Sequence, residues 1–263
     1  MLKLMEKLKI QQYLPDSLER FHLEAEVTKL CYKIREENIA DPDFVKMDIS
    51  KLLSEENIKN LLNEISTKKC TKIGDLNIPN HPETVYLSVV DKNLNSVSII
   101  NSICYAFGSA ITSNTSGILF HNRGTNFRIE ENHPNCIEGH KRPLHTIIPG
   151  LVVNEKNDTI LSYGVMGGQY QPVGQLHVIN NIFDYHMTPQ QAITFPRAFH
   201  FNNIYKLERE IDISIKDNLE KIGHKVEYTN ETHGGGQAIL IDRKKGNLLG
   251  GSDPRKDGYA SGY

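Results

Sequence analysis

Apolar residues recur every three or four positions near the start of the chain, which is the period of a helix with one apolar face. From Leu18 onward this spacing continues to Ile34, with charged residues between the apolar ones. We predict a helix here, ended by Asp41-Pro42, because a residue that precedes proline avoids the helical conformation. A second helix is predicted from Ser54 to Ile65, where a serine cap and two glutamates begin the pattern. The stretch from Lys68 to Pro82 has no periodicity, and we expect an exposed linker there.

After this linker apolar and polar residues alternate, which is the period of a half-buried strand. The runs Thr84–Val90 and Ser96–Ser102 are separated by a short polar turn, so we predict a hairpin. Further strands are predicted at Gly117–Phe120, Leu151–Val153, Thr159–Tyr163, Lys225–Tyr228 and Ala238–Asp242.

Three more helices are predicted between these strands. The first runs from Pro172 to Tyr185. The second opens with Thr188-Pro189-Gln190-Gln191, which combines a threonine cap, proline at the first position and glutamine at the third. The third spans Ile213 to Ile222 and is ended by Gly223. Because helices and strands do not alternate strictly, the pattern favours an α+β fold over a doubly wound sheet.

The composition excludes some classes of function. The chain has 263 residues and a formal net charge of −2 at pH 7. The near-neutral charge argues against a nucleic-acid partner and against a polybasic membrane protein. No apolar run approaches the roughly 20 residues of a transmembrane helix, so we expect no membrane partner. The N-terminus does not resemble a secretion signal.

Cysteine and histidine positions bear on disulfides and metals. The four cysteines are widely separated without a CxxC pair, which predicts reduced thiols in a cytoplasmic protein. They are Cys31, Cys70, Cys104 and Cys136. Four histidines fall close together, but their spacings match no ligand pattern, and we predict no metal site. They are His121, His133, His140 and His145.

Two features have a catalytic and an ordinary interpretation. Thr84 begins a predicted strand, as a β-branched residue commonly does. A threonine exposed by chain cleavage is also a nucleophile, because its own α-amine serves as the base. Gly167-Gly168 follows a predicted strand and precedes a helix. It is either a simple turn or a place where backbone amides stabilise an oxyanion.

Several motifs occur in the order found in one enzyme family. They are TVYLSVVD, NSxxxxFGS, SGILFHNRGTNF, KRPLHTIIP, GVMGGQYQPVGQ, GGGQAI and GGSDPRKDGYASGY. Residues 84–263, which carry them, resemble the small catalytic subunit of the gamma-glutamyltransferases. HLEAEV and ADPDF, within residues 18–53, resemble the end of the large subunit. The variants TVYL, RGTNF and MGGQYQP are most similar to the intracellular branch, which includes amide hydrolases and acylases.

The resemblance implies a fold and an organisation. The fold is the α-β-β-α layered sandwich of N-terminal-nucleophile hydrolases, incomplete in this chain. Residues 1–83 are the helical end of the large subunit plus a linker, and 84–263 form the small catalytic subunit. Autocleavage before Thr84 releases the nucleophile, and no cofactor or metal is required. Family precursors are much longer, so the missing large-subunit half is the expected partner, possibly as a separate chain.

The resemblance also assigns roles to residues. The catalytic group consists of the nucleophile, a hydroxyl that steadies it and the oxyanion glycines: Thr84, Ser102, Gly167 and Gly168. The substrate-binding group holds the amino end and the carboxylate of a glutamyl donor: Arg123, Asn126, His145 and Thr146. The chain departs from the family where Cys104 replaces an asparagine and Val85-Tyr86 replaces a hydroxyl-histidine pair.

These departures change the expected substrate. A neutral Asn126 stands where the family has an acidic residue, and Arg123 adds a positive charge. We therefore expect a small-molecule amide or gamma-glutamyl substrate whose acyl part is acidic or neutral. Two alternatives remain: a non-catalytic remnant or subunit that needs a separate large subunit, and a metal-dependent amidase that uses the clustered histidines. We interpret the charged segment at Asp253 to Asp257 as mainly structural.

Overall fold

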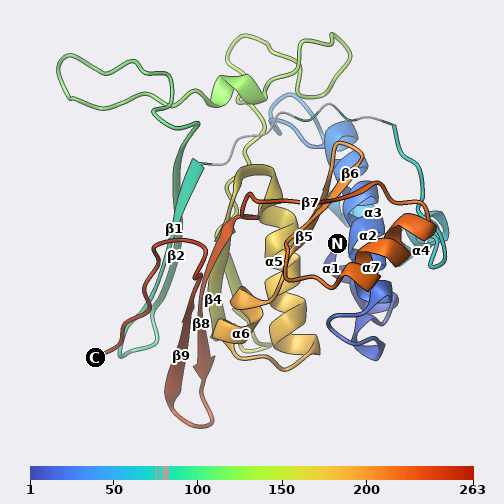
Figure 1. Cartoon of the computed structure of the whole chain (residues 1–263). Coiled ribbons are helices and arrows are strands. Elements are labelled where there is room, and N and C mark those ends of the chain that lie inside the picture. Colours follow the sequence, from blue (N-terminus) through green and yellow to red (C-terminus); the bar gives the residue numbers. More distant parts are fainter. Residues whose placement is uncertain (75, 77, 79–82) are drawn as a thin grey trace. The chain divides into compact units, whose positions relative to one another are not determined.

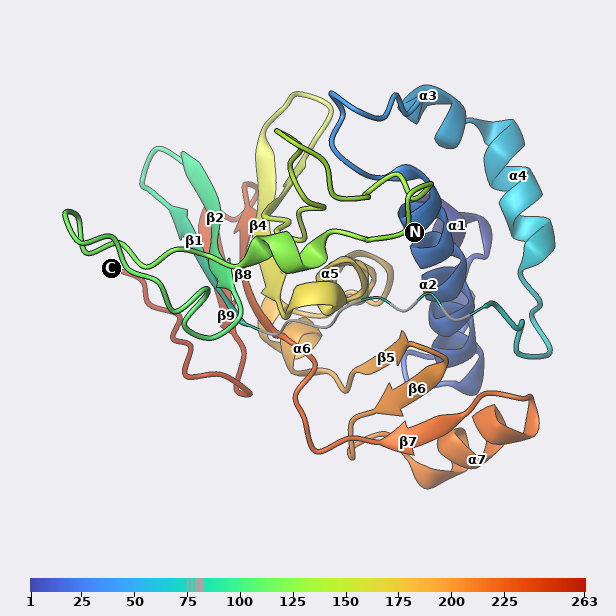
Figure 2. The same cartoon turned by 90° about the horizontal axis from the view of Figure 1, so that it is seen from above.

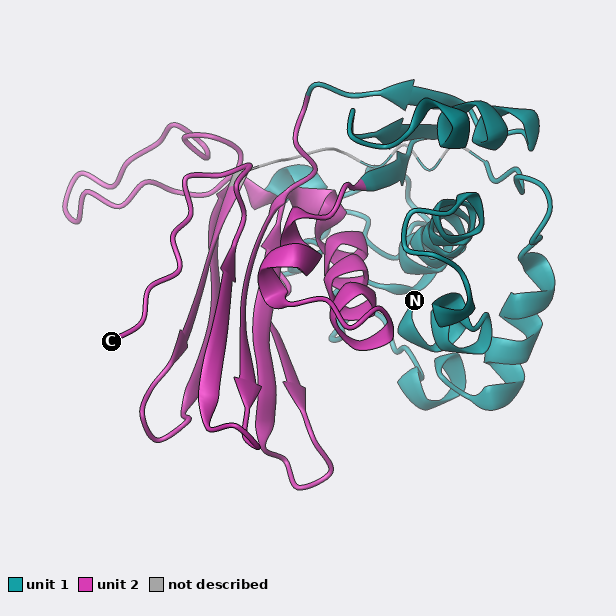
Figure 3. Cartoon of the chain, turned by 60° about the horizontal axis from the view of Figure 1, so that its bottom comes forward, with its two compact units in different colours: residues 1–79, 124–145, 198–230 teal, residues 80–123, 146–197, 231–263 magenta. Residues whose placement is uncertain are grey.

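The computed structural model describes residues 1–74, 76, 78 and 83–263 (Figure 1). The chain divides into two compact units that are interleaved in the sequence (Figure 3). Unit 1 comprises residues 1–79, 124–145 and 198–230, and unit 2 comprises residues 80–123, 146–197 and 231–263. The short 3-10 helix η2 (Arg123–Asn126) contains one of the points where the chain passes from one unit to the other.

Unit 1 is built around the long helix α2 (Leu18–Asn38). Ser17 caps its first turn by accepting a hydrogen bond from the Arg20 amide over 3.3 Å. Several charged side chains that stand between the apolar ones are buried, and they are paired within the helix. Arg20 Nε donates to Glu24 Oε1 over 2.9 Å, and Lys29 forms an ion pair with Glu26. Burying a charge is tolerated when it is paired in this way.

A three-stranded sheet and α7 (Ile213–Lys221) pack against α2 in the same unit. The sheet has the order β5 (Ala198–Phe201), β6 (Ile204–Leu207), β7 (Val226–Tyr228), with the last pair parallel. The buried Tyr205 hydroxyl donates to the carbonyl oxygen of Phe21 over 2.8 Å. The remaining elements of unit 1 are α1 (Leu2–Lys7), η1 (Ile10–Gln12), α3 (Ile49–Leu52) and α4 (Glu55–Glu64).

Unit 2 contains two sheets that face each other (Figure 2). The first is the hairpin of β1 (Glu83–Val90) and β2 (Ser96–Cys104). The second is antiparallel, with the order β3 (Gly150–Val153), β4 (Thr159–Met166), β8 (Gly235–Asp242), β9 (Asn247–Ser252). Serine hydroxyls join the layers: Ser88 Oγ lies 2.6 Å from Ser162 Oγ, and Ser98 Oγ donates to the Tyr163 carbonyl over 3.3 Å.

Helices cover the opposite face of the four-stranded sheet. α5 (Gln171–Ile179) packs on β4, and α6 (Pro189–Thr194) packs on β8 and β9. The 3-10 helix η3 (Gly168–Tyr170) precedes α5, and the π-helical turn η4 (Asn180–Asp184) follows it. Unit 2 therefore has hairpin, sheet and helices in successive layers, which confirms the predicted layered α+β arrangement.

The structure corrects several predicted elements. Gly117–Phe120 is not a strand, because within the described residues its one pairing is an isolated bridge between Thr112 and Leu119. The linker is not uniformly exposed, since Ile78 is buried, and six of its residues (75, 77 and 79–82) lie outside the described chain. The predicted helix to Tyr185 is α5 followed by a π turn. The sequence pattern missed β5, β6 and β9, which are short.

Candidate active site

Thr84 lies in β1 at an irregularity in the hairpin. Glu83 pairs with Cys104, whereas Val85 pairs with Asn101, so the register shifts across Thr84. Two residues of β2 therefore stand opposite Thr84, and one of them is Ser102. A bulge of this kind redirects a side chain and is frequent beside active sites. The half-buried Thr84 therefore differs from an ordinary strand residue, because it lies opposite a bulge instead of a single paired residue.

Ser102 belongs to a hydrogen-bonded group within unit 2. Its Oγ accepts a hydrogen bond from Arg123 Nη2 over 3.1 Å and another from the Cys104 amide over 3.0 Å. Arg123 Nη1 also donates to Thr146 Oγ1 over 3.2 Å. Arg123 and Thr146 are buried, and burial lowers the pKa of the guanidinium. The arginine therefore joins the strand opposite Thr84 to the segment that begins at Thr146.

Gly167 and Gly168 form the turn between β4 and η3. Their φ angles are +122° and +56°, which residues with a side chain rarely adopt. A Cβ on Gly167 would lie 2.6 Å from the Cα of Gly234, so the two backbones touch. Such close packing requires glycine at Gly167, and it holds a glycine-rich turn directly after the strand. This arrangement suits backbone amides that receive a developing oxyanion.

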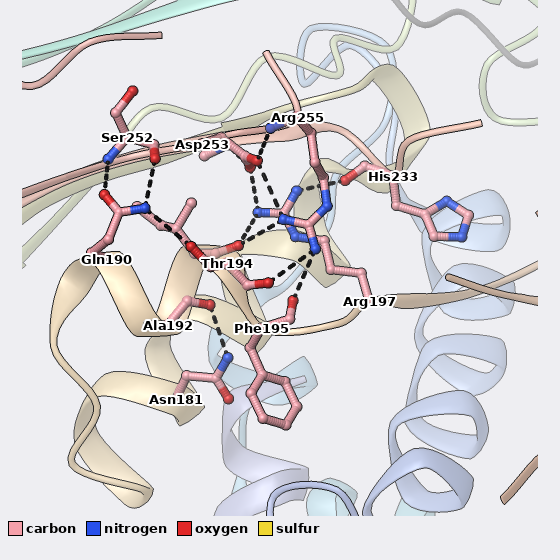
Figure 4. A network of polar contacts seen from close by, with 12 residues as sticks. Asn181, Gln190, Ala192, Thr194, Phe195, Arg197, His233, Ser252, Asp253 and Arg255 are labelled. Carbon is pink, nitrogen blue, oxygen red and sulfur yellow. Dashed lines mark hydrogen bonds and ion pairs between the residues drawn. The ribbon is translucent and has the colours of Figure 1, made fainter. Parts of the chain in front are cut away.

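Arg197 and Asp253 form a buried ion pair (Figure 4). The pair anchors the triple-glycine segment, whose Gly234 touches the turn at Gly167. Arg197 Nη1 donates to the His233 carbonyl over 2.8 Å, and Asp253 Oδ2 accepts from the Gly236 amide over 2.7 Å. Arg255 Nη1 donates to the Ile193 carbonyl over 3.0 Å and to Asp253 Oδ1 over 3.3 Å. The segment at 253 is therefore part of an internal network, which supports its structural interpretation.

The pKa of Asp253 shows how this network balances its charge. Burial alone would raise the pKa of the carboxyl, because it disfavours the ionised form. The Arg197 guanidinium and the amides of Arg255 and Gly236 outweigh burial and hold the pKa below its usual range. Asp253 is therefore ionised in the folded protein at neutral pH.

Asn126, at the end of η2, and His145 lie in unit 1, where asparagine side chains join the segments around them. Asn126 Nδ2 donates to the Leu144 carbonyl over 3.1 Å, and the Leu144 amide donates to Asn135 Oδ1 over 3.0 Å. Asn135 Nδ2 donates to the Asn126 carbonyl over 2.7 Å. Asn126 Oδ1 is buried and has no hydrogen-bond partner among the described residues. That oxygen can accept a hydrogen bond from a ligand.

Arg142 fastens the same loop to the segment after α2. Asp41 accepts hydrogen bonds from the Arg142 amide over 2.7 Å, from Nε over 3.0 Å and from Nη2 over 2.6 Å. These contacts hold the pKa of Asp41 well below its usual range. The ion pair stands three residues before His145 and so limits the movement of that part of the loop.

The predicted site residues fall into two groups. Unit 2 contains Thr84, Ser102, Arg123, Thr146, Gly167 and Gly168, and unit 1 contains Asn126 and His145. Hydrogen bonds join Ser102, Arg123 and Thr146 directly. Among the described residues, the four histidines that are clustered in the sequence do not come together as a group of three potential metal ligands. The sequence interpretation did not anticipate Arg197 or Asn135, whose partners are distant in sequence and leave no periodic signal.

The cysteines bear on disulfide formation, and the helices bear on membrane insertion. All four cysteines belong to the described residues, and none forms a disulfide. Among the helices that the structure describes, none is long and apolar enough to cross a membrane.

The sequence of the whole chain is similar to those of known proteins. A sequence model of the gamma-glutamyltranspeptidase family matches residues 1–263. A glutathione hydrolase-like YwrD proenzyme of Bacillus subtilis is 36% identical, over 99% of this chain and 50% of that protein. An oxamate amidohydrolase proenzyme of Klebsiella pneumoniae is 30% identical, over 94% of this chain and 48% of that protein. The chain thus spans about half the length of the curated relatives it matches.

A solved structure supports the same conclusion about the fold. The cephalosporin acylase from Bacillus halodurans superimposes with a TM-score of 0.85 and 31% sequence identity, over 100% of this chain and 49% of that chain. The layered sheets and the glycine turn define an α+β protein of the N-terminal-nucleophile hydrolase class. The chain belongs to the gamma-glutamyltranspeptidase family, and similarity to the acylase fits its acylase-like branch.

Proposed function

We propose that this chain is the catalytic part of an amidohydrolase or acyltransferase in which cleavage before Thr84 creates an N-terminal threonine nucleophile. The observation that carries the proposal is the bulge in β2 opposite Thr84, which sets Thr84 against the strand segment containing Ser102. Relatives named as proenzymes support a cleaved chain. The division into residues 1–83 and 84–263 remains part of this proposal, as does a cytoplasmic location.

The reaction would follow from the chemistry of the residues. The freed α-amine of Thr84 takes the proton of its own hydroxyl, and the oxygen attacks an amide carbonyl. The amides of Gly167 and Gly168 stabilise the oxyanion, and the amine leaves with a proton. Water, or a second amine, then attacks the acyl-threonine ester and frees the enzyme. Ser102, held by Arg123, positions the nucleophile.

The polar groups around Arg123 and Asn126 determine the proposed donor class. Asn126 offers a neutral carbonyl oxygen, which accepts a hydrogen bond from an N–H without the charge that would favour an ammonium. Arg123 adds a buried positive charge, which favours a carboxylate or a polarised carbonyl. We therefore propose a donor with an acidic or neutral acyl group, and oxamate amidohydrolase among the relatives is consistent with this choice.

We propose that the outer face of the hairpin binds the polypeptide that corresponds to the N-terminal half of the relatives. Five large apolar side chains of this face are between 46% and 67% exposed: Val85, Leu87, Val89, Val97 and Ile99. The opposite face of the hairpin carries Tyr86, Ser88 and Ser98 and packs on β4. The relatives are about twice as long as the matched region, which supplies a suitable partner.

Mass spectrometry of the purified chain, with and without the N-terminal half of a relative supplied in trans, tests the proposal. We expect a cut between Glu83 and Thr84 in the wild type, none in Thr84→Ala and slower cutting in Thr84→Ser. Thr115→Ala, an exposed threonine of the same unit, is the control and should cut normally. Cutting elsewhere, or equal cutting in Thr84→Ala, would refute the assignment of the nucleophile.

A further inference from the structure

Unit 1 contains a group of buried metal-ligating side chains that is separate from the proposed active site. His22 and Glu26 lie four residues apart on α2 and therefore share one face of the helix. His224, which follows α7, meets them from the other side. One ligand atom from each residue lies within 4.8 Å of the other two, and all three residues are buried.

The hydrogen bonds of His22 determine which of its nitrogens is available. His22 Nε2 lies 2.8 Å from the Ser66 carbonyl oxygen, which can only accept, so Nε2 carries the proton. His22 Nδ1 therefore has a free lone pair, and it faces His224 Nε2 over 2.8 Å. A metal-binding histidine typically donates its second nitrogen to a carbonyl in this way. His22 thus already has the tautomer and orientation of a ligand.

His224 Nε2 carries the proton in its contact with His22 Nδ1, because His22 Nδ1 can only accept once His22 Nε2 donates to Ser66. His224 Nδ1 is buried and has no hydrogen-bond partner in the part of the chain that the structure describes, so it can take that proton when a metal binds Nε2.

Glu26 supplies a carboxylate that is currently shared with a cation. Lys29 Nζ is ion-paired with Glu26 Oε1 and also donates to the Thr71 carbonyl over 2.6 Å and to Cys70 Sγ over 3.2 Å. The Thr71 amide donates to both carboxylate oxygens, over 3.1 and 3.2 Å, and keeps the carboxylate oriented. A metal at this position would compete with the ammonium for Oε1 and would leave Lys29 its other two partners.

We propose that His22 Nδ1, His224 Nε2 and Glu26 Oε1 form a binding site for a divalent metal of the zinc type. Two imidazoles and one carboxylate are a donor set that zinc accepts. Tetrahedral donors about 2.0–2.1 Å from zinc lie about 3.3–3.4 Å from one another. The two nitrogens, 2.8 Å apart, would need to separate by about 0.5 Å, and the 4.0 Å between His224 Nε2 and Glu26 Oε1 would need to shorten by about 0.6 Å.

The site differs from the histidine cluster considered in the sequence, and it would have a structural role. It would join α2 to the turn after α7, because its ligands His22 and His224 are 202 positions apart in the sequence. A metal that binds the folded state and not the unfolded chain raises stability by RT ln(1 + [metal]/Kd), so the stabilisation grows with the concentration of free metal. The Thr84 chemistry does not require it, so the two proposals stand or fall separately.

Equilibrium dialysis of the full chain against zinc, followed by metal analysis, tests the site. We expect one tightly bound zinc per chain and visible d–d bands of a tetrahedral cobalt(II) complex when cobalt replaces it. His22→Gln and His224→Phe should each weaken zinc binding at least tenfold. His140→Gln, which removes an exposed histidine of the same unit, is the matched control and should bind as the wild type does.

Replacing Lys29, whose ammonium competes with a metal for Glu26, keeps the test decisive if a histidine variant fails to fold. Lys29→Met removes the ammonium from Glu26, so zinc should bind at least tenfold more tightly, and zinc should raise the melting temperature of this variant more than that of the wild type. If neither the wild type nor Lys29→Met binds zinc, the proposal is wrong. It is also wrong if binding persists unchanged in His22→Gln and His224→Phe, because the metal then lies elsewhere.

Discussion

Arg197 Nη2 donates to Asp253 Oδ2 over 2.6 Å, and neither side chain has any exposed surface. The same carboxylate oxygen accepts from the Gly236 amide, and the same guanidinium donates to the His233 carbonyl. The pair therefore holds both ends of the segment 233–236, whose Gly234 touches Gly167. A charge pair that is remote in sequence from the glycine turn thus determines where the turn lies.

Removing one member of this pair should be costly. Asp253→Ala would leave the Arg197 guanidinium buried without its counter-charge, and we expect a loss of about 3–5 kcal/mol in the free energy of unfolding. Urea denaturation measures it. Asp257→Ala, an exposed aspartate of the same segment, is the control and should change stability by no more than about 0.5 kcal/mol.

A paired replacement separates the buried charge from simple loss of packing. Because an apolar pair can substitute for a buried ion pair, Arg197→Met combined with Asp253→Leu should recover part of the lost stability. The rest should stay lost, because the His233 carbonyl and the Gly236 amide lose their partners. A loss below about 1 kcal/mol in Asp253→Ala would contradict the role assigned to the pair.

Asp41 should make the acid stability of the protein depend on Arg142. Hydrogen bonds from Arg142 hold the pKa of Asp41 below its usual range, so the unfolded state binds more protons than the folded state at acid pH. The stability from this group is complete above the unfolded pKa of about 3.9 and is lost as the pH falls below that value. Asp41→Asn should therefore flatten the dependence of the free energy of unfolding on pH in the acid range.

Urea denaturation at several acid pH values provides the measurement. Asp43→Asn is the matched control, because Asp43 contacts Arg142 through one exposed ion pair of 2.9 Å. Its acid dependence should follow that of the wild type closely. Identical pH profiles for the wild type and Asp41→Asn would show that the contact with Arg142 does not shift the titration in solution.

The donor preference should respond to the charge at position 126, if the proposed function holds. An enzyme completed with its N-terminal half should act on glutaryl or oxamate-type amides about ten- to a hundredfold better than on glutathione, in kcat/KM. That ratio corresponds to one charge-assisted contact of about 1.5–3 kcal/mol. Asn126→Asp should shift the preference toward glutathione, because it restores a partner for the substrate ammonium.

Thr84→Ala serves as the blank in this comparison and should turn over neither class of substrate. A kcat/KM for glutathione equal to that for the acidic donors in the wild type would refute the predicted preference. An unchanged ratio in Asn126→Asp would show that Asn126 does not contact the donor.

The outer face of the hairpin should make the chain self-associate when it is produced alone. Leu87 and Ile99 are directly paired across the hairpin, and they are 55% and 49% exposed. Leaving large aliphatic side chains uncovered forfeits about 1.5–3 kcal/mol each, which drives association. We expect binding of hydrophobic dyes and oligomers in size-exclusion chromatography, both reduced when the N-terminal half is supplied.

Polar substitutions on the outer face of the hairpin test whether this face causes the self-association. Leu87→Ser with Ile99→Ser should reduce self-association, whereas Ile213→Ser, which alters an exposed isoleucine of α7, should not. A wild-type chain that is a cooperatively melting, active monomer would show that the face needs no partner.

Local patterns in the sequence determined much of the secondary structure. The alternation from Thr84 to Ser102 predicted the hairpin, because a strand with one buried face requires a period of two. The capping box at Thr188 and Gln191 could also be predicted, because its hydrogen bonds join residues only three positions apart in the sequence. The ordered motifs indicated the family, which the comparisons confirm.

Tertiary structure decided what local patterns do not contain. Gly117–Phe120 is a short apolar run of the kind found in strands, but it lacks a neighbouring strand in the described chain, and a ladder requires one. Glu26 and Lys29 occupy positions typical of an exposed helix surface, yet they are buried because other segments cover that side of α2. His22 meets His224, and Arg197 meets Asp253, only once the chain has folded. Such contacts depend on which segments pack together, and no spacing in the sequence records that choice.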